Sequence, residues 1–410
     1  MIKKKISIIG QGYVGLPISL LLSKNSQQVS AFDINTKLIK KFKNGSYGLL
    51  CENEEDVVKL YLSQYKKRNL EFTDILSESD IYVVCVPTPI TNQNKPDLKH
   101  VYSAVSGICK FLKKDDLIII ESTIAIGSID KIQKLILKKS KIKNLKYHIA
   151  YCPERVLPGN ALNEIIKNDR VVGGINKKSQ TLAKNFYKIF VKGSINATSV
   201  GVAEFTKLSE NAFRDINIAF ANELSILCQK NNVNYNEVIK YANKHPRVNI
   251  LKPGIGVGGH CIPIDPWFLI ENYKKDFSII KNSRLVNINK SIQISKNIIN
   301  ILNSNKAIKK NDSILFLGLS YKENIGDVRE SPAIKIVNYV SKKINQKIFV
   351  NDPYVKDNIF YDKKNITQCN LSRVIKKSKF IVILVGHSDY KNLHKLLSKQ
   401  QIIYDACDYF

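Results

Sequence analysis

A glycine-rich turn near the start of the chain constrains the fold most strongly. Residues 6–9 are an apolar run that predicts a short buried strand, and GQGYVG follows at 10–15. An apolar helix is expected from Val14 to about Ser23, and a second strand over 28–32 ends at Asp33. The interval from Gly10 to Asp33 is 23 residues. This order of strand, glycine turn, helix and acidic strand end is typical of a dinucleotide-binding unit.

Each residue of this turn has a physical reason to be there. Gly10 permits the tight turn, Gly12 lets the backbone approach a pyrophosphate, and Gly15 lets the helix pack on the strand. The N-terminus of the helix then holds the anion. Asp33 can accept hydrogen bonds from the adenosine ribose, which favours NAD over NADP. A chance glycine turn is the weaker interpretation, because GxGxxG stands between a strand and a helix.

Further along the chain, strand and helix patterns continue to alternate. Apolar runs at 81–86, 117–121 and 147–151 predict buried strands. Such alternation predicts a parallel, doubly wound sheet, in which ligands bind beyond the carboxyl ends of the strands. Thr88, Thr123 and Glu154 follow these three runs, and we therefore expect them at one edge of the sheet.

The pattern changes at 202–229, where apolar residues recur at helical spacing without Pro or an internal Gly. We expect one long central helix there, with an interface role, and a further helix over 282–302. A second α/β unit is predicted from residue 313, with strands over 313–317, 347–350, 380–385 and 402–405. It lacks GxGxxG. The pattern alone supports two interpretations equally. The second unit is either a degenerate copy of the first that binds another nucleotide, or a purely structural domain.

The net charge needs dissection before it implies a partner. The 410 residues include 64 Lys plus Arg against 35 Asp plus Glu, a formal charge of +29. A basic surface attracts phosphate, so the charge alone is compatible with nucleic-acid binding. However, only eight of these residues are Arg, and a genome-wide preference for Lys, Ile and Asn codons is the better explanation of the profile. We expect no nucleic-acid partner, and we expect Arg where its planar fork is needed.

Composition also limits the class of protein. Hydrophobic residues make up 44% and charged residues 24%, as in ordinary globular proteins. The eight cysteines form no CxxC pair and no zinc-site spacing, which predicts thiols in a reducing compartment, the cytoplasm, and no metal. No apolar stretch reaches 18 residues, and the N-terminal segment lacks a cleavage site. We therefore expect neither membrane insertion nor a signal peptide.

Cys261 is the most informative cysteine, because it lies in the glycine-rich segment GIGVGGHCIPID at 254–265. The glycines leave backbone amides open and let a ligand approach closely. A thiol in such a loop is a candidate nucleophile, although a structural thiol is an equally good interpretation from the pattern alone. Lys207 and Asn211 lie one turn apart on the long helix. By itself, a lone Lys in this Lys-rich chain is more often a solvated charge.

Taken together, seven segments resemble the motifs of the UDP-glucose/GDP-mannose dehydrogenase family, the nucleotide-sugar 6-dehydrogenases. They stand in the order of the family and cover nearly the whole chain. They are GQGYVGLP, CVPTP, ESTIA, CPERVLPG, AEFTKLSENAFRDINIAFANELS, HPRVNILKPGIGVGGHCIPIDPWF and GLSYKENIGDVRESPA. The resemblance implies an α/β fold with two Rossmann-like doubly wound domains, joined by a long central helix and a helical dimerisation region. The implied domains are an NAD-binding domain over 1–197, a central helical dimerisation domain with the cysteine loop over 198–305, and a UDP-binding domain over 306–410.

The resemblance also implies the reaction. Members of the family oxidise the C6 hydroxyl of a nucleotide sugar to a carboxylate with two NAD⁺, through a thiohemiacetal and a thioester on the cysteine that matches Cys261. The motifs are most similar to the branch that acts on UDP-N-acetyl-D-mannosamine, in surface polysaccharide synthesis. UDP-N-acetylglucosamine and UDP-N-acetylgalactosamine are the alternative substrates. A two-electron NAD dehydrogenase is a further alternative, which would not need Cys261.

Individual roles follow from the same resemblance. Lys207 matches an acid/base or oxyanion-stabilising lysine, and Asn211 matches an asparagine that holds the oxyanion and a water. Asp265 matches an aspartate that positions water and proton transfers, and Glu154 a glutamate implicated in thioester hydrolysis. The expected NAD contacts are Gly10, Gly12, Tyr13, Val14, Gly15, Asp33, Thr88, Thr123 and Arg329. The expected UDP-sugar contacts are Arg155, Val156, Leu157, Lys207, Asn211, Arg214, His245, Arg247, Gly258, Tyr321 and Lys322.

The resemblance further implies a homodimer in which Arg247 reaches the site of the neighbouring subunit. Two positions depart from the family pattern. Cys407 stands where the family usually has Lys or Arg, and residues 51–54 replace an early Glu-Pro-Gly-Leu segment. Five of the eight Arg nevertheless fall in or beside the seven segments. These are Arg155, Arg170, Arg214, Arg247 and Arg329.

Overall fold

The computed structural model describes residues 4–47, 55–91, 93–140, 146–156, 160–272 and 276–410. The chain forms two compact units, and we describe each by itself. The first comprises Met1–Glu210 with Trp267–Glu271, and the second comprises Asn211–Pro266 with Asn272–Phe410. Helix α8 (Val200–Lys230) begins in the first unit and ends in the second. Helix α10 (Asp265–Leu269) also contributes residues to both.

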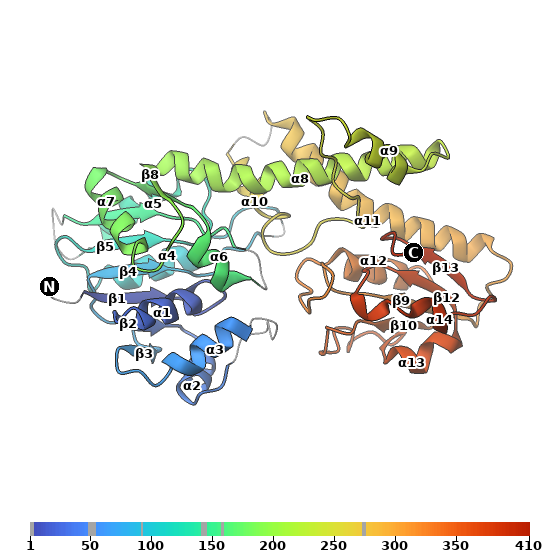
Figure 1. The fold of residues 1–410 in the computed structure, drawn as a ribbon, viewed down its shortest axis with the longest axis horizontal. Coiled ribbons are helices and arrows are strands. Elements are labelled where there is room, and N and C mark those ends of the chain that lie inside the picture. The colour runs from blue at the N-terminus through green and yellow to red at the C-terminus, as the bar shows by residue number, and fades with distance from the viewer. Residues whose placement is uncertain (1–3, 48–54, 92, 141–145, 157–159, 273–275) are drawn as a thin grey trace. The chain divides into compact units, whose positions relative to one another are not determined.

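In the described part of the first unit, eight strands form one sheet in the order β3-β2-β1-β4-β5-β6-β7-β8 (Figure 1). The first six follow the order of doubly wound dinucleotide-binding folds, in which the direction of winding reverses between β1 and β4. The glycine turn follows β1 and therefore lies at this switch point. The strands are β1 Lys5–Ile9, β2 Gln28–Phe32, β3 Leu70–Thr73, β4 Ile81–Val84, β5 Leu117–Ile120, β6 His148–Tyr151, β7 Arg170–Gly174 and β8 Ile195–Ser199.

One pair of strands corrects the expectation of a parallel sheet. Strand β7 runs antiparallel to β6, with Ala150 opposite Gly174 and Tyr151 opposite Gly173. The other neighbouring strands of this sheet pair in parallel. The difference arises because the chain enters β7 at the edge where β6 ends, so no crossover back along the sheet is made.

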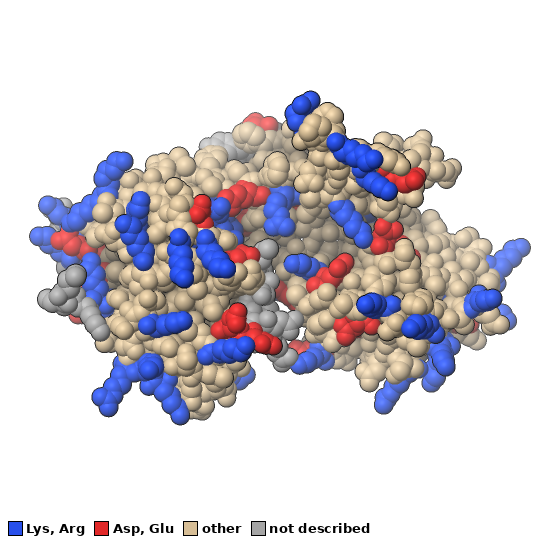
Figure 2. All heavy atoms as spheres, in the orientation of Figure 1, with Lys and Arg blue, Asp and Glu red and all other residues tan. Residues whose placement is uncertain are grey.

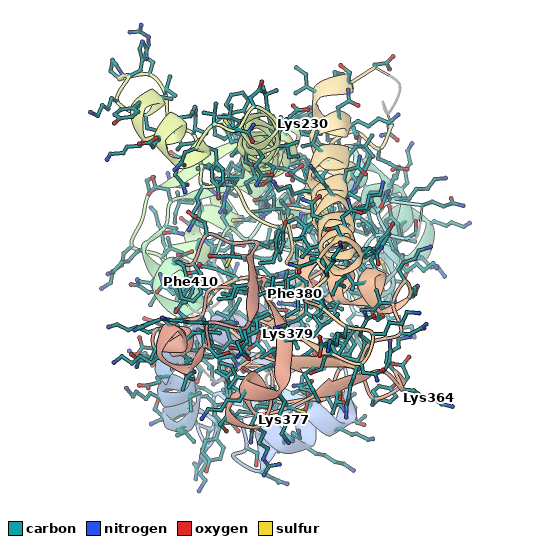
Figure 3. The ribbon with its side chains drawn as sticks, turned by 90° about the vertical axis from the view of Figure 1, so that its right-hand side faces the viewer. Lys230, Lys364, Lys377, Lys379, Phe380 and Phe410 are labelled. Atoms are coloured by element: carbon teal, nitrogen blue, oxygen red, sulfur yellow. The ribbon has the colours of Figure 1, made fainter. Side chains whose placement is uncertain are left out.

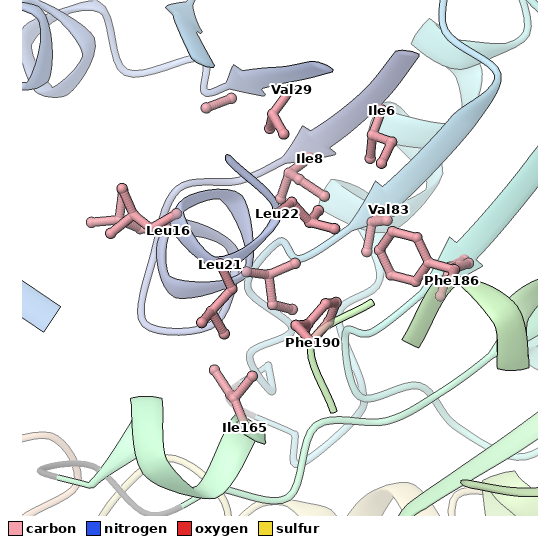
Figure 4. Close-up of a cluster of buried hydrophobic side chains, with 14 of the residues drawn as sticks. Ile6, Ile8, Leu16, Leu21, Leu22, Val29, Val83, Ile165, Phe186 and Phe190 are labelled. Atoms are coloured by element: carbon pink, nitrogen blue, oxygen red, sulfur yellow. The ribbon is translucent and has the colours of Figure 1, made fainter. Parts of the chain in front are cut away.

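Helices cover the sheet and bury its apolar side chains. Leu16, Leu21 and Leu22 of α1 belong to one cluster with Ile6 and Ile8 of β1 (Figure 4). The helix is apolar almost all round, as the run LPISLLL predicts, because it packs both on the sheet and beneath other elements. The helices of this unit are α1 Gly15–Lys24, α2 Thr36–Lys43, α3 Glu55–Gln64, α4 Lys99–Ile108, α5 Ser128–Lys139, α6 Ala161–Lys167 and α7 Lys177–Tyr187.

The second unit contains α11 and the larger part of α8, the two predicted long helices. The helix expected over 202–229 is confirmed as α8, and the one expected over 282–302 is confirmed as α11 (Ser278–Ser304). Between them lie α9 (Tyr235–Ala242) and the glycine-rich segment that carries Cys261. Buried residues of α11 include several polar ones, among them Arg284 and Asn287, so its contacts are not purely apolar.

A second sheet follows, with five parallel strands in the described residues, in the order β11-β10-β9-β12-β13. This repeats the order of the first five strands of the N-terminal sheet. Ile314 and Phe316 belong to one core cluster, and Leu315 and Leu317 to another, so both faces of the sheet are covered. The elements are β9 Ser313–Leu317, α12 Pro332–Ser341, β10 Ile348–Asn351, β11 Ile366–Gln368, α13 Leu371–Val374, η1 Ile375–Lys377, β12 Ser378–Ile383, η2 Ser388–Tyr390, α14 Leu393–Leu396 and β13 Ile402–Asp405.

The basic residues lie mainly at the surface. On the face in Figure 2, Lys and Arg side chains are spread among acidic ones. Lys230, Lys364 and Lys377 are exposed, whereas Phe380, three residues after Lys377, is buried in its strand (Figure 3). None of the helices in the described ranges combines the length and the apolar character needed to cross a bilayer.

Candidate functional site

The turn after β1 has the geometry that a dinucleotide needs. A Cβ at Gly15 would lie 1.8 Å from the backbone oxygen of Gly10, so only glycine lets α1 pack this closely. A Cβ at Gly12 would meet nothing within 4 Å, which leaves room at the point where a pyrophosphate would approach. Val14 provides no side-chain cap for the first turn of α1, whose N–H groups can therefore bind an anion.

Asp33 lies at the end of β2 beside this turn. Its carboxylate accepts from the backbone N–H of Gln11 at 2.8 Å and from that of Asn35 at 2.8 Å. Gln11 is buried, donates to the backbone oxygen of Ile8 at 2.9 Å and accepts from the hydroxyl of Ser19 at 3.1 Å. The turn and the carboxylate that is expected to bind the ribose are thus held together. Sequence reasoning gave Gln11 no role, because it is the variable position of GxGxxG.

The ends of the next strands form the same edge. Strands β4, β5 and β6 are parallel neighbours, so Thr88, Thr123 and Glu154 all follow their carboxyl ends, as the sequence predicts. The hydroxyl of Ser122 donates to the backbone oxygen of Val86 at 2.7 Å and ties two of these segments together.

Glu154 is a carboxyl with perturbed acidity at this edge. Its pKa is raised to about 7, chiefly because burial disfavours the charged form. The positive charges of Lys207 and Arg170 oppose this rise, and the Glu121 carboxylate adds to it. The side chain accepts from the backbone N–H of Val156. A carboxyl whose pKa lies near neutrality is suited to general acid–base catalysis.

A buried ionic cluster accompanies Glu154. The Arg170 guanidinium lies 3.4 Å from the Glu121 carboxylate, which also accepts from the hydroxyl of Tyr187 at 2.6 Å. Arg170 and Glu121 are almost completely buried. The scarcity of Arg in the sequence singled out Arg170, but without a role.

Arg155, which follows Glu154, has a partner on α8. Its guanidinium lies 3.0 Å from the Glu210 carboxylate and donates to the backbone oxygen of Asp169 at 3.3 Å. Glu210 and Arg214 are one turn apart on α8, yet Glu210 forms an ion pair with Arg155. The ion pair holds the segment after β6 against the helix. Of the neighbouring expected contacts, Val156 is partly buried, and Leu157 lies outside the described residues.

The predicted catalytic residues of α8 are buried, which a solvated surface lysine would not be. Lys207 is 5% exposed and Asn211 8% exposed, on successive turns of one face. The amide of Asn211 donates to the Asp265 carboxylate at 2.6 Å. Burying a lysine is costly unless its charge is compensated, so Lys207 does not have the surroundings of a solvated charge. The interpretation of Lys207 as a simple surface charge is therefore wrong.

Cys261 lies at the tight turn that leads into α10. Its backbone oxygen accepts from the N–H of Ile264 at 3.0 Å and from that of Asp265 at 2.8 Å. The thiol and the Asp265 side chain, which Asn211 contacts, therefore belong to one turn of chain. Cys261 is partly exposed.

Other cysteines are less suited to react. Burial raises the pKa of the Cys85, Cys109, Cys152 and Cys407 thiols, that of Cys152 to about 12. A raised pKa lowers the thiolate fraction at neutral pH. In the part of the chain that the structure describes, no group of three or more His, Cys, Asp or Glu side chains could hold a metal ion.

In the second unit, the glycine loop meets the segment after β9. A Cβ at Gly258 would lie 2.5 Å from the Cβ of Tyr321, so these two predicted substrate contacts are in direct apposition. The N–H of Gly259 donates to the backbone oxygen of Arg329 at 3.0 Å. Lys322 is exposed beside Tyr321. This arrangement lies at the winding reversal of the second sheet, between β9 and β12, where such sheets bind ligands.

Three other predicted contact residues lie at the surface of the described structure. Arg214, His245 and Arg247 are exposed. Arg329 pairs with the Asp327 carboxylate, with Nε at 3.0 Å from both oxygens, and its contact with NAD stays a prediction. Cys407 contacts the Asp405 carboxylate at 3.5 Å.

Three domains of one known protein family together match most of the chain. The NAD binding domain, the central domain and the UDP binding domain of the UDP-glucose/GDP-mannose dehydrogenase family match residues 4–191, 201–289 and 315–410. A UDP-N-acetyl-D-mannosamine dehydrogenase of Methanococcus maripaludis is 40% identical over 396 residues, 96% of this chain and 88% of the relative.

Solved structures agree with this match. The UDP-D-ManNAc dehydrogenase of Pyrococcus horikoshii is similar with a TM-score of 0.88 and 33% identity, over 99% of this chain and 96% of that chain. An NDP-N-acetyl-D-galactosaminuronic acid dehydrogenase of Methanosarcina mazei has a TM-score of 0.83 and 28% identity, over 100% of this chain and 92% of that chain.

Proposed function

Because the chain belongs to the UDP-glucose/GDP-mannose dehydrogenase family, we propose that it oxidises UDP-N-acetyl-D-mannosamine at C6 to UDP-N-acetyl-D-mannosaminuronate. The observation that carries the proposal is the 40% identity, over 96% of the chain, to a relative that bears this activity in its name. The chain has the NAD binding domain of the family. The glycine turn, the uncapped start of α1 and Asp33 fit the pyrophosphate and ribose of NAD.

When bound, NAD⁺ accepts a hydride from the substrate carbon in each of two oxidations. The residues of the chain do the remaining work. The Cys261 thiolate adds to the aldehyde carbon left by the first oxidation, and the aldehyde oxygen takes a proton to give a thiohemiacetal. Loss of a hydride and a proton from it gives a thioester on Cys261. Water then attacks the thioester carbon, the C–S bond breaks, and the uronate and the free thiol are released.

Four groups are proposed to assist these steps. Lys207 takes the hydroxyl proton or stabilises the oxygen as it becomes negative, and Asn211 donates to the same oxygen. Asp265, whose carboxylate accepts from Asn211 at 2.6 Å, holds that amide in place. Glu154 takes a proton from the water that hydrolyses the thioester, a role that its pKa of about 7 suits.

Recognition of the UDP-sugar is proposed for the residues named by the motifs. The UDP binding domain of the family matches residues 315–410, which include Tyr321 and Lys322. The apposition of Tyr321 with Gly258 supports a nucleotide site at this loop. Arg155, Val156, Leu157, Arg214, His245 and Arg247 complete the proposed set.

We also propose a homodimer in which Arg247 enters the site of the partner subunit. An exposed apolar stripe on α8 supports an interface, because Phe213, Phe220 and Leu227 recur every seven residues and are 68%, 55% and 58% exposed. The proposed domains remain 1–197, 198–305 and 306–410, and the limits of the family matches support this division. A cytoplasmic location is proposed, because the described cysteines are thiols.

The substrate is tested by NADH formation with purified UDP-N-acetylmannosamine, UDP-N-acetylglucosamine, UDP-N-acetylgalactosamine and UDP-glucose. We expect the highest kcat/KM with UDP-N-acetylmannosamine. The similarity to the Methanosarcina structure makes UDP-N-acetylgalactosamine the second candidate. A higher kcat/KM with any of the other three sugars would overturn the assignment of the epimer, and no NADH with any of them would overturn the reaction.

A further inference from the structure

A buried polar chain links the long helices of the second unit. Asp215 of α8 lies against Arg284 of α11, and the two side chains form an ion pair. The Asp215 carboxylate also accepts from the side-chain amide of Asn287 at 2.8 Å, and that amide reaches the Asp215 backbone oxygen at 3.0 Å. The three residues are at most 2% exposed. Polar groups buried this deeply need hydrogen-bond partners, with an acceptor for each donor and a donor for each acceptor.

The chain of hydrogen bonds has one direction. Because a carboxylate only accepts, Asn287 must turn its NH₂ group toward Asp215 and its oxygen away. That oxygen accepts from the side-chain NH₂ of Asn222 at 2.9 Å. The oxygen of Asn222 is then left to accept from the backbone N–H of Gly254 at 2.9 Å. Asp215 thus fixes the orientation of two amides, and the second of them holds the start of the glycine loop.

The next residues of the loop are held as well. The hydroxyl of Ser291, on α11, donates to the backbone oxygen of Ile255 at 2.8 Å. Gly256 has φ of +137°, and a Cβ there would lie 2.6 Å from the Ser291 oxygen. The backbone over 254–256 therefore lies directly on α11, with no space for a side chain at its third residue.

This anchored segment leads to the nucleophile. Cys261 lies five residues after Gly256, and between them Gly259 is bonded to Arg329. We propose that Asp215, Asn287, Asn222 and Ser291 are positioning residues that hold the loop so that the Cys261 thiol meets its substrate carbon. The inference rests on the proposed function, because it assumes that Cys261 is the nucleophile. None of the four touches the reacting atoms; they act through the backbone of the loop.

We call the hydrogen bonds that run from Asp215 through Asn287 and Asn222 to Gly254 the relay. One substitution of equal size should break it. In Asn222→Asp, the new carboxylate still accepts from Gly254 but presents an oxygen to the oxygen of Asn287. If Asn287 turns over to relieve this, its oxygen faces the Asp215 carboxylate instead. While the new carboxylate is ionised, either orientation leaves two acceptors in contact, so the loop loses its support although the side chain keeps its size.

The reactivity of the Cys261 thiol can be measured without substrate, and it reports on how firmly the glycine loop is held. The experiment measures the rate at which iodoacetamide alkylates Cys261, by mass spectrometry of its peptide, together with kcat and the KM for NAD. For Asn222→Asp we expect alkylation to quicken about fivefold or more and kcat to fall about tenfold or more, with the KM for NAD unchanged. A more accessible thiol in a slower enzyme is the signature of lost positioning.

Two further variants make the test decisive. Asn217→Asp makes the same chemical change on α8. Within the residues that the structure describes, the Asn217 amide donates to its own helix, at the Phe213 backbone oxygen, and we expect wild-type values. Ser291→Ala removes one anchor and is mild enough to fold, and we expect a smaller change in the same direction as Asn222→Asp. Wild-type alkylation and kcat in both Asn222→Asp and Ser291→Ala, with only a lowered Tm, would show that the relay merely joins two helices. If the wild-type protein oxidises no UDP-sugar, the proposed function fails. Unchanged alkylation of Cys261 in Asn222→Asp and Ser291→Ala overturns the relay and leaves the proposed function standing.

Discussion

The side-chain amide of Asn211 donates to the carboxylate of Asp265 across 2.6 Å. Both groups are buried, one on the long helix α8 and one in the turn that begins at Cys261. The contact joins the candidate oxyanion donor to the loop of the candidate nucleophile. It also fixes the orientation of the amide, because a carboxylate only accepts.

Asn211→Asp should therefore disable the enzyme with little change in size. The new carboxylate would face Asp265 at 2.6 Å and would no longer donate to a developing oxyanion. We expect kcat to fall about 100-fold, the usual cost of losing one such donor. Steady-state kinetics checks this, with the KM for NAD as the internal control. A variant that retains kcat would remove Asn211 from the chemistry.

The pKa of Glu154 predicts how the reaction responds to pH. A base with a pKa of about 7 is mostly protonated below that value, so thioester hydrolysis should accelerate as pH rises through 7. Quenched samples at pH 6 should contain more acyl-enzyme by mass spectrometry than samples at pH 8. Glu154→Gln should hold the acyl-enzyme at both values. An acyl-enzyme level that does not depend on pH in the wild type would exclude this role.

The charge of Lys207 should influence the pH dependence of thioester hydrolysis. The positive charge of Lys207 lowers the pKa of Glu154, so its removal should raise that pKa. In Lys207→Met, we expect the rise of the hydrolysis rate to move to higher pH, in addition to a lower kcat. Single-turnover hydrolysis of the acyl-enzyme measures the shift. A shift to lower pH would contradict the electrostatic relationship.

The same shift has a consequence for stability. The folded-state pKa of Glu154 lies above 4.5, the usual value for a glutamate, so the folded protein binds the proton more tightly than the unfolded chain. Stability should therefore decrease as pH rises from about 4.5 to about 7, because ionisation favours the unfolded state over this window. Glu154→Gln removes this effect, and its Tm relative to wild type should rise across the window. A Tm difference that is constant with pH would contradict the prediction.

Asp33 should govern the affinity for the cofactor. Asp33→Asn keeps one acceptor for the backbone N–H groups but removes the charge that would bind the ribose hydroxyls. We expect the KM for NAD to increase about tenfold, equivalent to about 1.4 kcal/mol, with the KM for the UDP-sugar unchanged. Glu71→Gln, at an exposed position of the neighbouring strand β3, is the matched control and should leave both values unchanged.

Gly256 should be intolerant of even one methyl group. Gly256→Ala forces a side chain into a conformation with φ of +137° and onto the hydroxyl of Ser291. We expect a loss of about 1–3 kcal/mol or more in the free energy of unfolding. Gly201→Ala, on α8 with nothing within 4 Å of its new Cβ, should be neutral or slightly stabilising. Chemical denaturation of both variants makes the comparison, and equal stabilities would refute it.

Local patterns predicted the elements that depend on local chemistry. The strand over 28–32 and those over 313–317 and 402–405 agree with β2, β9 and β13. Apolar runs between turn residues mark such strands. Strand β8 was not predicted, because INATS alternates polar residues that are partly exposed at the edge of the sheet. The antiparallel pairing of β7 could not be predicted either, since it depends on where the chain re-enters the sheet.

Only part of the candidate site could be predicted from the sequence. Glycine spacing points to Cys261, and motif resemblance points to Cys261, Lys207 and Asn211. They did not reveal the burial of Lys207, which distinguishes it from the many surface lysines. Nor did they reveal the relay through Asn222 and Asn287. These two residues are 65 apart in sequence, and an Asn-rich chain gives no sign of which amides are buried.

The central claim is that one UDP-sugar is oxidised twice, with Cys261 holding it between the steps. The most direct measurement is the ratio of NADH formed to UDP-N-acetylmannosamine consumed, in the wild type and in Cys261→Ser. We predict two NADH per sugar and a uronate product for the wild type, and a failure of Cys261→Ser to complete the oxidation. One NADH per sugar in the wild type, or a fully active Cys261→Ser enzyme, would contradict the account.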